Sequence, residues 1–265
     1  MGFRKLREKA SVKLTDLHHG VLRGWNSATS ALWFRRNGFK RNSLRGLGKM
    51  PVPDSHNPAR TETPVSMWVR KPLPPPHTWS IVGRRANAYL FLTPQKRAYF
   101  LKLAGGRTNS GPRASEYAGI NSVKNLVKVL KSGLKSEIPV GLLLTAERHD
   151  YLISEPVRGL PMEEALKLAT KGERREIALG IAEQLADWHN KGFAHGHVYD
   201  NILVYSTIAT IIDPTRITTK KQVSAIGLFM DRDVAGVNSY FAKDKELSDL
   251  FTKTYYQLRG LPAKF

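Results

Sequence analysis

The sequence contains no cysteine, which excludes disulfide bonds and thiolate metal sites. It also lacks any uncharged apolar run of about 18 residues, so we expect no transmembrane helix. The first residues are charged and lack the apolar stretch of a signal peptide, so we do not expect export. Leu6 stands where N-terminal myristoylation requires Ser or Thr, so we do not expect that lipid anchor either.

Acidic residues are scarce relative to basic ones. The chain has 22 Asp/Glu against 42 Lys/Arg, a formal net charge of +20, and residues 1–71 alone hold 15 Lys/Arg against 4 Asp/Glu. Such a field attracts polyanions. We therefore expect an anionic partner, with membrane or glycolipid headgroups as the first choice and nucleic acid as the second. No pattern in the sequence indicates the oligomeric state.

Residues 1–77 are predicted to form a basic N-terminal arm that ends in a linker. Four apolar residues fall on one face of a possible helix: Leu14, Leu17, Val21 and Trp25. A basic helix with such a face can lie on a membrane surface or pack on the rest of the protein, and both alternatives stand. Residues 50–77 are rich in Pro, Ser and Thr, which is typical of a semi-rigid linker. The compact domain, residues 78–265, is therefore expected to begin near Thr78.

The periodicity of the remaining chain predicts an α+β fold with two lobes. Residues 78–158 are expected to form a small antiparallel sheet lobe with one helix. Its short apolar runs lie at 79–82, 88–92, 98–103, 140–144 and 151–154, and helical spacing covers 114–131. Residues 159–265 are expected to form a mainly helical lobe. Its helices are predicted at 162–169, 173–190, 222–241 and 245–258, with short strands at 202–205 and 209–212.

Candidate residues for phosphoryl transfer follow one another in a recognisable order. Lys102 lies inside a predicted strand, and Glu116 opens the following helix. The segment His195–Val204 follows the long helix, and Asp213 follows a short apolar run. Phosphoryl transfer needs a lysine for the phosphates, a carboxylate that holds this lysine, and oxygen ligands for Mg²⁺. The order and spacing resemble the protein-kinase signature.

This resemblance implies a two-lobed kinase-like fold that binds ATP and Mg²⁺. Lys102 would hold the phosphates and Glu116 would anchor Lys102. Asn201 and Asp213 would bind the metal. His195 would belong to the catalytic loop, together with His197 and Asp200, one of which would take the acceptor's proton.

Three segments refine the resemblance within the superfamily. The segments Tyr99–Lys102 and Ala186–His195 resemble the bacterial lipopolysaccharide core kinases, which phosphorylate sugars at the inner face of the inner membrane. That likeness implies a cytoplasmic phosphotransferase, peripheral at the inner membrane surface, with a sugar or another hydroxyl compound as acceptor. Met230–Phe241 instead resembles the RIO-type kinases, which act on pre-ribosomes.

The catalytic loop departs from the family pattern. His197 occupies the position of the family's catalytic Asp, and the loop between it and Asn201 is one residue short. Because Asp200 directly precedes Asn201, their side chains would point to opposite sides of an extended segment, which favours His197 as the base. Pro214 follows Asp213 where the family has Phe, and Gly83–Asn87 replaces the glycine-rich loop.

Three readings of function therefore stand. The first is an active kinase of the lipopolysaccharide-core-kinase type. The second is a pseudokinase scaffold that binds an anionic partner through the arm. The third is a RIO-like kinase associated with the ribosome.

Overall fold

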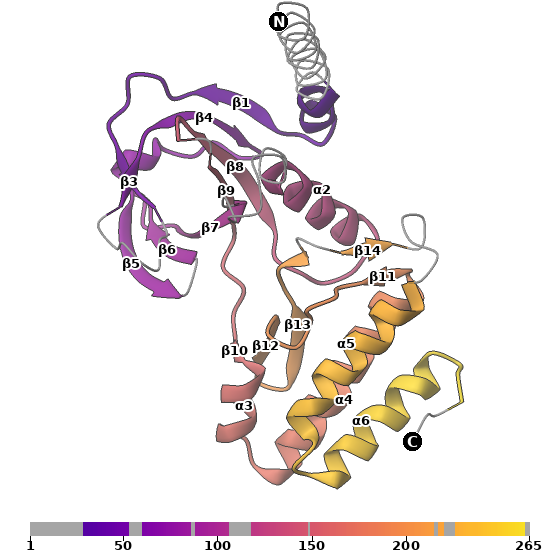
Figure 1. The fold of residues 1–265 in the computed structure, drawn as a ribbon. Coiled ribbons are helices and arrows are strands. Elements are labelled where there is room, and N and C mark those ends of the chain that lie inside the picture. The colour runs from indigo at the N-terminus through magenta and orange to yellow at the C-terminus, as the bar shows by residue number, and fades with distance from the viewer. Residues whose placement is uncertain are drawn as a thin grey trace, which may run out of the picture.

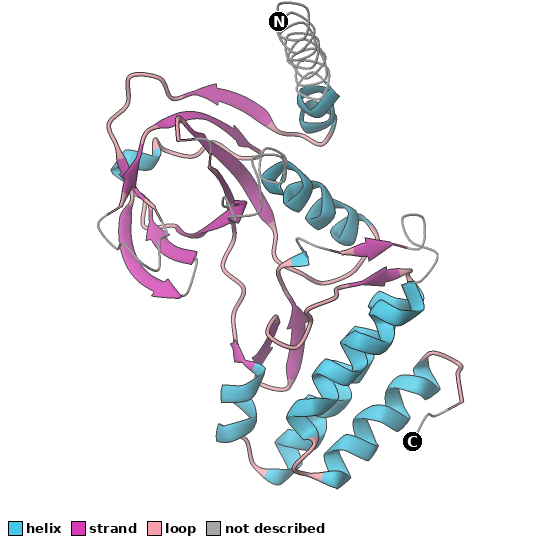
Figure 2. Ribbon diagram, in the orientation of Figure 1, coloured by secondary structure: helices cyan, strands magenta, loops and turns pink. Residues whose placement is uncertain are grey.

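The computed structural model describes residues 29–52, 60–85, 88–105, 118–147, 149–214, 217–219 and 226–262. A lobe built on a curved antiparallel sheet lies above a mainly helical lobe, and the chain passes from one to the other after β9 (Figures 1 and 2). The predicted two-lobed α+β fold is confirmed. Within the described residues, no helix is both long and apolar enough to cross a membrane.

The sheet lobe is a seven-stranded sheet in the order β1-β4-β8-β9-β7-β6-β5. Every neighbouring pair is antiparallel. The strands are β1 (Lys40–Ser43), β4 (Pro64–Val69), β5 (Ser80–Arg85), β6 (Ala88–Leu92), β7 (Ala98–Gly105), β8 (Pro139–Thr145) and β9 (Asp150–Ser154). Helix α2 (Ala118–Lys131) covers one face, where its Val123 and Leu126 pack with Leu142 of β8. The smaller elements of this lobe are β2 (Met50–Pro51), β3 (Thr61–Glu62) and the 3-10 turn η1 (Pro76–Thr78).

The predicted domain start near Thr78 is wrong, because the sheet extends back into the supposed arm. Strand β4 pairs with β8 along its length, and β1 pairs with β4. Residues 29–36 are helical, and Phe34 of this helix stacks on Trp68 of β4 with ring centroids 5.0 Å apart. Both rings are buried. Residues 60–77 are therefore part of the folded lobe rather than a linker, whereas the predicted helix face at Leu14–Trp25 lies outside the described residues.

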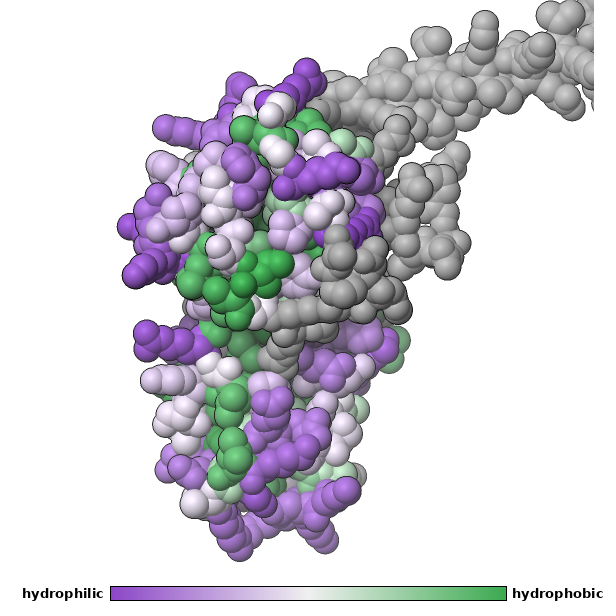
Figure 3. All heavy atoms as spheres, turned by 90° about the vertical axis from the view of Figure 1, so that its left-hand side faces the viewer, coloured by the Kyte–Doolittle hydropathy of each residue, from purple (hydrophilic) through white to green (hydrophobic). Residues whose placement is uncertain are grey.

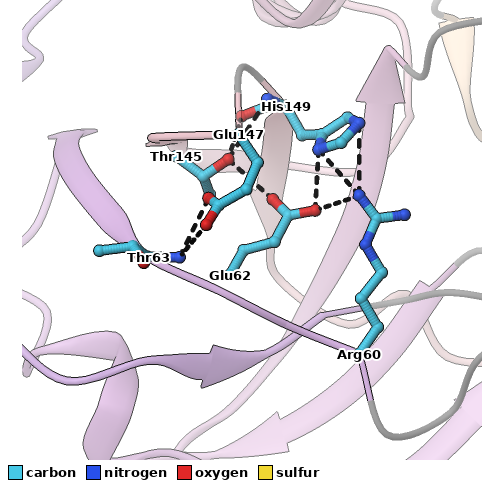
Figure 4. A network of polar contacts seen from close by, with 6 residues as sticks. All are labelled: Arg60, Glu62, Thr63, Thr145, Glu147 and His149. Carbon is cyan, nitrogen blue, oxygen red and sulfur yellow. Dashed lines mark hydrogen bonds and ion pairs between the residues drawn. The ribbon is translucent and has the colours of Figure 1, made fainter.

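A network of polar side chains fixes the start of β4 to the hairpin between β8 and β9 (Figure 4). Glu62 has only 1% of its surface exposed. It forms ion pairs with Arg60 and with His149, whose Nδ1 lies 2.8 Å from its carboxylate. The Thr145 hydroxyl donates a 2.7 Å hydrogen bond to the same side chain. This network explains why the segment before β4, although flanked by prolines, is held in a single position against the sheet.

The helical lobe packs four helices around one apolar core. They are α3 (Met162–Leu168), α4 (Lys171–Asn190), α5 (Ile226–Phe241) and α6 (Lys245–Leu258). Thr170 and Glu173 form a capping box that starts α4. The apolar stripe predicted for this helix is confirmed, since Ile177, Ile181 and Trp188 are buried. Short strands complete the lobe: β10 (Leu160–Pro161), β11 (Phe193–Ala194), β12 (Ile202–Tyr205), β13 (Ile208–Ile211) and β14 (Thr218–Thr219).

Candidate active site

The hairpin of β12 and β13 brings Asn201 and Asp213 together. Asn201 directly precedes β12, Asp213 follows β13 by one residue, and the two strands pair antiparallel. The backbone N–H of Ile212 donates to the carbonyl of Asn201 at 2.8 Å, which continues the pairing beyond the strand ends. Residues twelve positions apart in the sequence therefore end at the same edge of the hairpin, as the kinase resemblance implies.

Lys102 reaches this edge from the sheet lobe. It lies in β7 and its Nζ forms an ion pair with Oδ2 of Asp213. The two side chains are 25% and 19% exposed, so the pair is shielded from water on most sides. Asp213 has a φ of +57°, a left-handed conformation that Asp tolerates better than most residues. Its second oxygen, Oδ1, is buried and has no hydrogen-bond partner among the described residues.

A second carboxylate, Glu137, lies beside this ion pair. It precedes β8, is 8% exposed, and accepts a 3.2 Å hydrogen bond from the hydroxyl of Ser154. Burial raises the pKa of Glu137 and the charge on Asp213 raises it further, while Lys102 and a backbone hydrogen bond from Asp213 lower it. No kinase motif marks the segment between α2 and β8, so the sequence pattern does not indicate this residue.

His195 supports the loop of residues 195–201 from inside. Its ring is buried, and Nε2 donates to the carbonyl of Ile212 at 2.8 Å. The backbone N–H of His197 donates to Nδ1 of the same ring at 3.3 Å. Burial lowers the pKa of His195, so the ring is neutral and its two nitrogens are occupied by the backbone. The geometry gives it the role of a positioning residue between the loop and the strand end before Asp213.

Helix α5 holds the other side of the loop. Asp233 is 1% exposed and accepts hydrogen bonds from the backbone N–H groups of His195 at 2.7 Å and Gly196 at 2.8 Å. Gly236, one turn further along, lies under Tyr199, and a Cβ there would approach that ring to 2.8 Å. An acid inside an apolar helix is a signal for such an anchor, since a buried carboxylate needs partners. In the sequence, this segment stands out only for its resemblance to the RIO-type kinases.

The two candidates for the proton-accepting group have different surroundings. His197 is half-buried, and its Nδ1 lies 3.4 Å from the hydroxyl of Tyr199. Asp200 is exposed and accepts a 3.1 Å hydrogen bond from the hydroxyl of Tyr240 in α5. The side-chain nitrogen of Asn201 donates to the carbonyl of His197 at 2.8 Å. Because that nitrogen is engaged, the amide oxygen of Asn201 is the atom free to ligate a cation.

The two residues that the resemblance implies as metal ligands, Asn201 and Asp213, lie in the described part of the chain. Asn201 and Asp213 offer hard oxygen atoms, which Mg²⁺ prefers, and phosphate oxygens and water commonly complete its coordination. The buried, unpartnered Oδ1 of Asp213 fits such a ligand. No group of three or more His, Asp or Glu side chains gathers as a metal site in the part of the chain that the structure describes. Glu116 lies outside the described residues, as do the side chains of Arg84 and Arg85.

Comparisons with known proteins identify the fold. No family model matches the sequence, and no curated protein matches it significantly. An aminoglycoside-3'-phosphotransferase of type VIII superposes with a TM-score of 0.52 at 17% identity, over 70% of this chain and 88% of that one. WaaP in complex with acyl carrier protein superposes with a TM-score of 0.45 at 18% identity, over 68% and 80%. The similarity to the phosphotransferase shows that the chain has a protein-kinase-like fold.

Proposed function

We propose that this protein is an ATP- and Mg²⁺-dependent phosphotransferase that acts on an alcohol group. The observation that carries the proposal is the ion pair between Lys102 and Asp213 across the two lobes, at the strand edge that also holds Asn201. Lys102 would bind the nucleotide phosphates, and Asn201 and Asp213 would hold Mg²⁺. Bound Mg²⁺ supplies positive charge that offsets the charge developing on the transferred phosphoryl group.

The proton of the acceptor would pass to the loop between His195 and Asn201. His197 takes the place of the family's catalytic Asp, and neutral imidazole accepts a proton readily near neutral pH. Asp200 is the other candidate, and its hydrogen bond with Tyr240 directs it towards α5. His197 is therefore proposed as the base.

The finer assignment is a kinase like those of the lipopolysaccharide core, acting on a sugar or another hydroxyl acceptor at the inner membrane surface. It is supported by the sequence likeness of Tyr99–Lys102 and Ala186–His195, and by the positive charge of the chain. The corresponding location is cytoplasmic and peripheral at that membrane.

The proposal is tested by nucleotide binding. ATP with Mg²⁺ at millimolar concentration is expected to raise the melting temperature of the full chain, because a ligand of the native state stabilises it. Lys102→Ala and Asp213→Asn should abolish the rise, while Lys71→Ala, which removes an exposed lysine paired with Glu155, should keep it. A wild-type protein that gains no stability from ATP and Mg²⁺ would contradict the proposal.

A pseudokinase scaffold is the second candidate function. It is favoured by His197 in place of the catalytic Asp and by the engagement of Asp200 with Tyr240. Incubation with labelled ATP and either lipopolysaccharide or ribosomal fractions distinguishes the three hypotheses of function. Label on lipopolysaccharide supports the proposed function, label on a ribosomal protein supports the RIO-like alternative, and ATP binding without transfer to either supports the scaffold.

A further inference from the structure

A large open cavity lies where α3, the start of α4 and the turn between α5 and α6 meet. Its volume is about 770 Å³, within the usual range for small-molecule sites. Its charged lining residues are Glu163, Lys167, Arg174, Lys243, Asp244 and Lys245. The cavity is separate from the Lys102–Asp213 pair, because neither of these two residues lines it.

Tyr240 connects this cavity to the catalytic loop. Its ring lines the cavity, and its hydroxyl donates to Oδ1 of Asp200 at 3.1 Å. Asp200 is the neighbour of Asn201 in the chain. A molecule in contact with Tyr240 in the cavity would therefore be one side chain away from the segment that is expected to receive the acceptor's hydroxyl group.

The positive charges of the cavity exceed what its acids can neutralise. Glu163 is paired with Lys167 at 2.7 Å, and Asp244 is engaged as the N-terminal cap of α6, where it accepts from the backbone of Leu247 at 3.2 Å. In contrast, Lys243 and Lys245 are exposed and form no hydrogen bond or ion pair within the described part of the chain. Among the described residues, the side chain of Arg174 donates only to a backbone carbonyl, that of Ala169.

We propose that this cavity binds the anionic group of the acceptor, and that the acceptor is an alcohol that also carries a phosphate group. The inference rests on the proposed function and adds the class of its substrate. Lys243, Lys245 and Arg174 would bind the acceptor's phosphate, and ammonium and guanidinium groups are the usual partners of phosphate oxygens. The Tyr240–Asp200 contact would mark the side of the cavity from which the free hydroxyl reaches the loop.

The transfer balances with ATP as the donor. The acceptor oxygen forms a bond to the γ-phosphorus, and the bond from that phosphorus to the bridging oxygen of ADP breaks. The proton of the acceptor hydroxyl passes to His197. The phosphate already present on the acceptor takes no part in the bond changes and serves only to hold the molecule.

Binding of a matched pair of sugars tests the inference without requiring turnover. The full chain is titrated with glucose 6-phosphate and with glucose, and the backbone amide signals of residues 239–247 are followed by NMR. Saturable shifts with glucose 6-phosphate and none with glucose are expected. Lys243→Ala/Lys245→Ala should weaken the binding by about tenfold or more, because two charge-assisted contacts are lost. Lys128→Ala/Lys253→Ala removes the same charge from exposed positions outside the cavity and should leave it unchanged.

Vesicles that contain phosphatidic acid provide a second arm, which distinguishes a lipid-linked phosphate from a soluble one. Binding in either arm that depends on Lys243 and Lys245 supports the inference and identifies the source. Equal binding by both double variants, or binding in neither arm, overturns it. ATP binding is measured separately, by the change in melting temperature and its loss in Lys102→Ala. If the chain binds ATP but neither phosphate compound, only the inference about the cavity is refuted. A chain that binds no ATP refutes the proposed function.

Discussion

A carboxylate buried beside another carboxylate raises the free energy of the folded state, and Glu137 is in that position. Ser154 and Lys102 compensate part of the cost, but the net direction is a raised pKa, with burial as the main cause. One oxygen of Glu137 has no hydrogen-bond partner among the described residues. Such a cost is common at functional sites, where groups are held for their chemistry rather than for stability.

Glu137→Gln is therefore expected to stabilise the free protein at pH 8, by about 1.4 kcal/mol for each unit of the pKa difference. The folded-state pKa of Glu137 lies above its unfolded value, so the wild type is most favoured when the group is protonated and loses stability as pH rises through the folded pKa. The Gln variant does not titrate. Urea unfolding at pH 5 and pH 8 should show a larger advantage for the variant at pH 8. A difference that is equal at both pH values would contradict the argument.

A second prediction at the scale of single residues concerns His197 and Asp200, in the loop of residues 195–201. If the protein transfers phosphate, His197→Ala should abolish transfer, while Asp200→Ala should only reduce it, because Asp200 is exposed and bonded to Tyr240. The measurement is the initial rate with labelled ATP and the acceptor identified by the fractionation. Full activity in both variants would show that neither side chain is the base. ATP binding should survive in both, since neither residue contacts Lys102.

The sequence pattern selects some residues of the candidate site and misses others for a physical reason. Lys102, Asn201 and Asp213 occur at spacings that resemble the protein-kinase signature, so a motif selects them. Glu137 and Asp233 act through burial and through contacts with backbone groups distant in sequence. No spacing rule expresses such contacts. Only Asp233, an acid within an apolar helix, indicates one of them in the sequence.

At the scale of elements, the network around Glu62 decides how β3 and β4 join the sheet lobe. Glu62→Ala should lower the free energy of unfolding by about 2–4 kcal/mol, because Arg60, His149 and Thr145 all lose a partner in a largely buried setting. Guanidinium unfolding measures this cost. Glu147→Ala is the comparison variant, since Glu147 is exposed and accepts from the backbone N–H of Thr63 at 3.1 Å. A similar cost for both variants would show that the network is not specific.

The elements of residues 78–265 were largely predictable, and those before Thr78 were not. The strand runs and helices follow their periodicity, and the observed α4, Lys171–Asn190, lies within two residues of its prediction. Strand β4 escaped detection because proline-rich sequence surrounds it and because four consecutive residues, Ser66–Val69, are buried. A strand buried on both faces shows no alternation of apolar and polar residues. The burial of the second face comes from the packing of Phe34 on Trp68, which is a contact between residues distant in sequence.

At the scale of the whole molecule, apolar surface remains exposed on one side. Figure 3 views the molecule from the side of β5, β6 and α3 and shows apolar side chains in two areas, one on each lobe. Ile81 and Val82 of β5 are 41% and 51% exposed, and Leu168 of α3 is 77% exposed. Hydrophilic side chains lie beside both areas. Residues 1–28 add six Lys/Arg against two Asp/Glu to the charge of the chain.

The last prediction compares two N-terminal deletions, one that removes the basic segment 1–28 alone and one that also removes strands of the sheet lobe. Deleting residues 1–28 should leave the melting temperature nearly unchanged, because the described sheet and its helix at 29–36 stay intact. Deleting residues 1–71 should prevent folding, because it removes β1 and β4 and exposes the edge of β8. If residues 1–28 bind the anionic partner, the shorter deletion should sharply reduce retention on anionic liposomes at low salt, where electrostatic attraction is least screened. Retention equal to that of the full chain would assign the binding to the folded domain instead, and parallel retention on nucleic acid would show whether the attraction is selective for lipid.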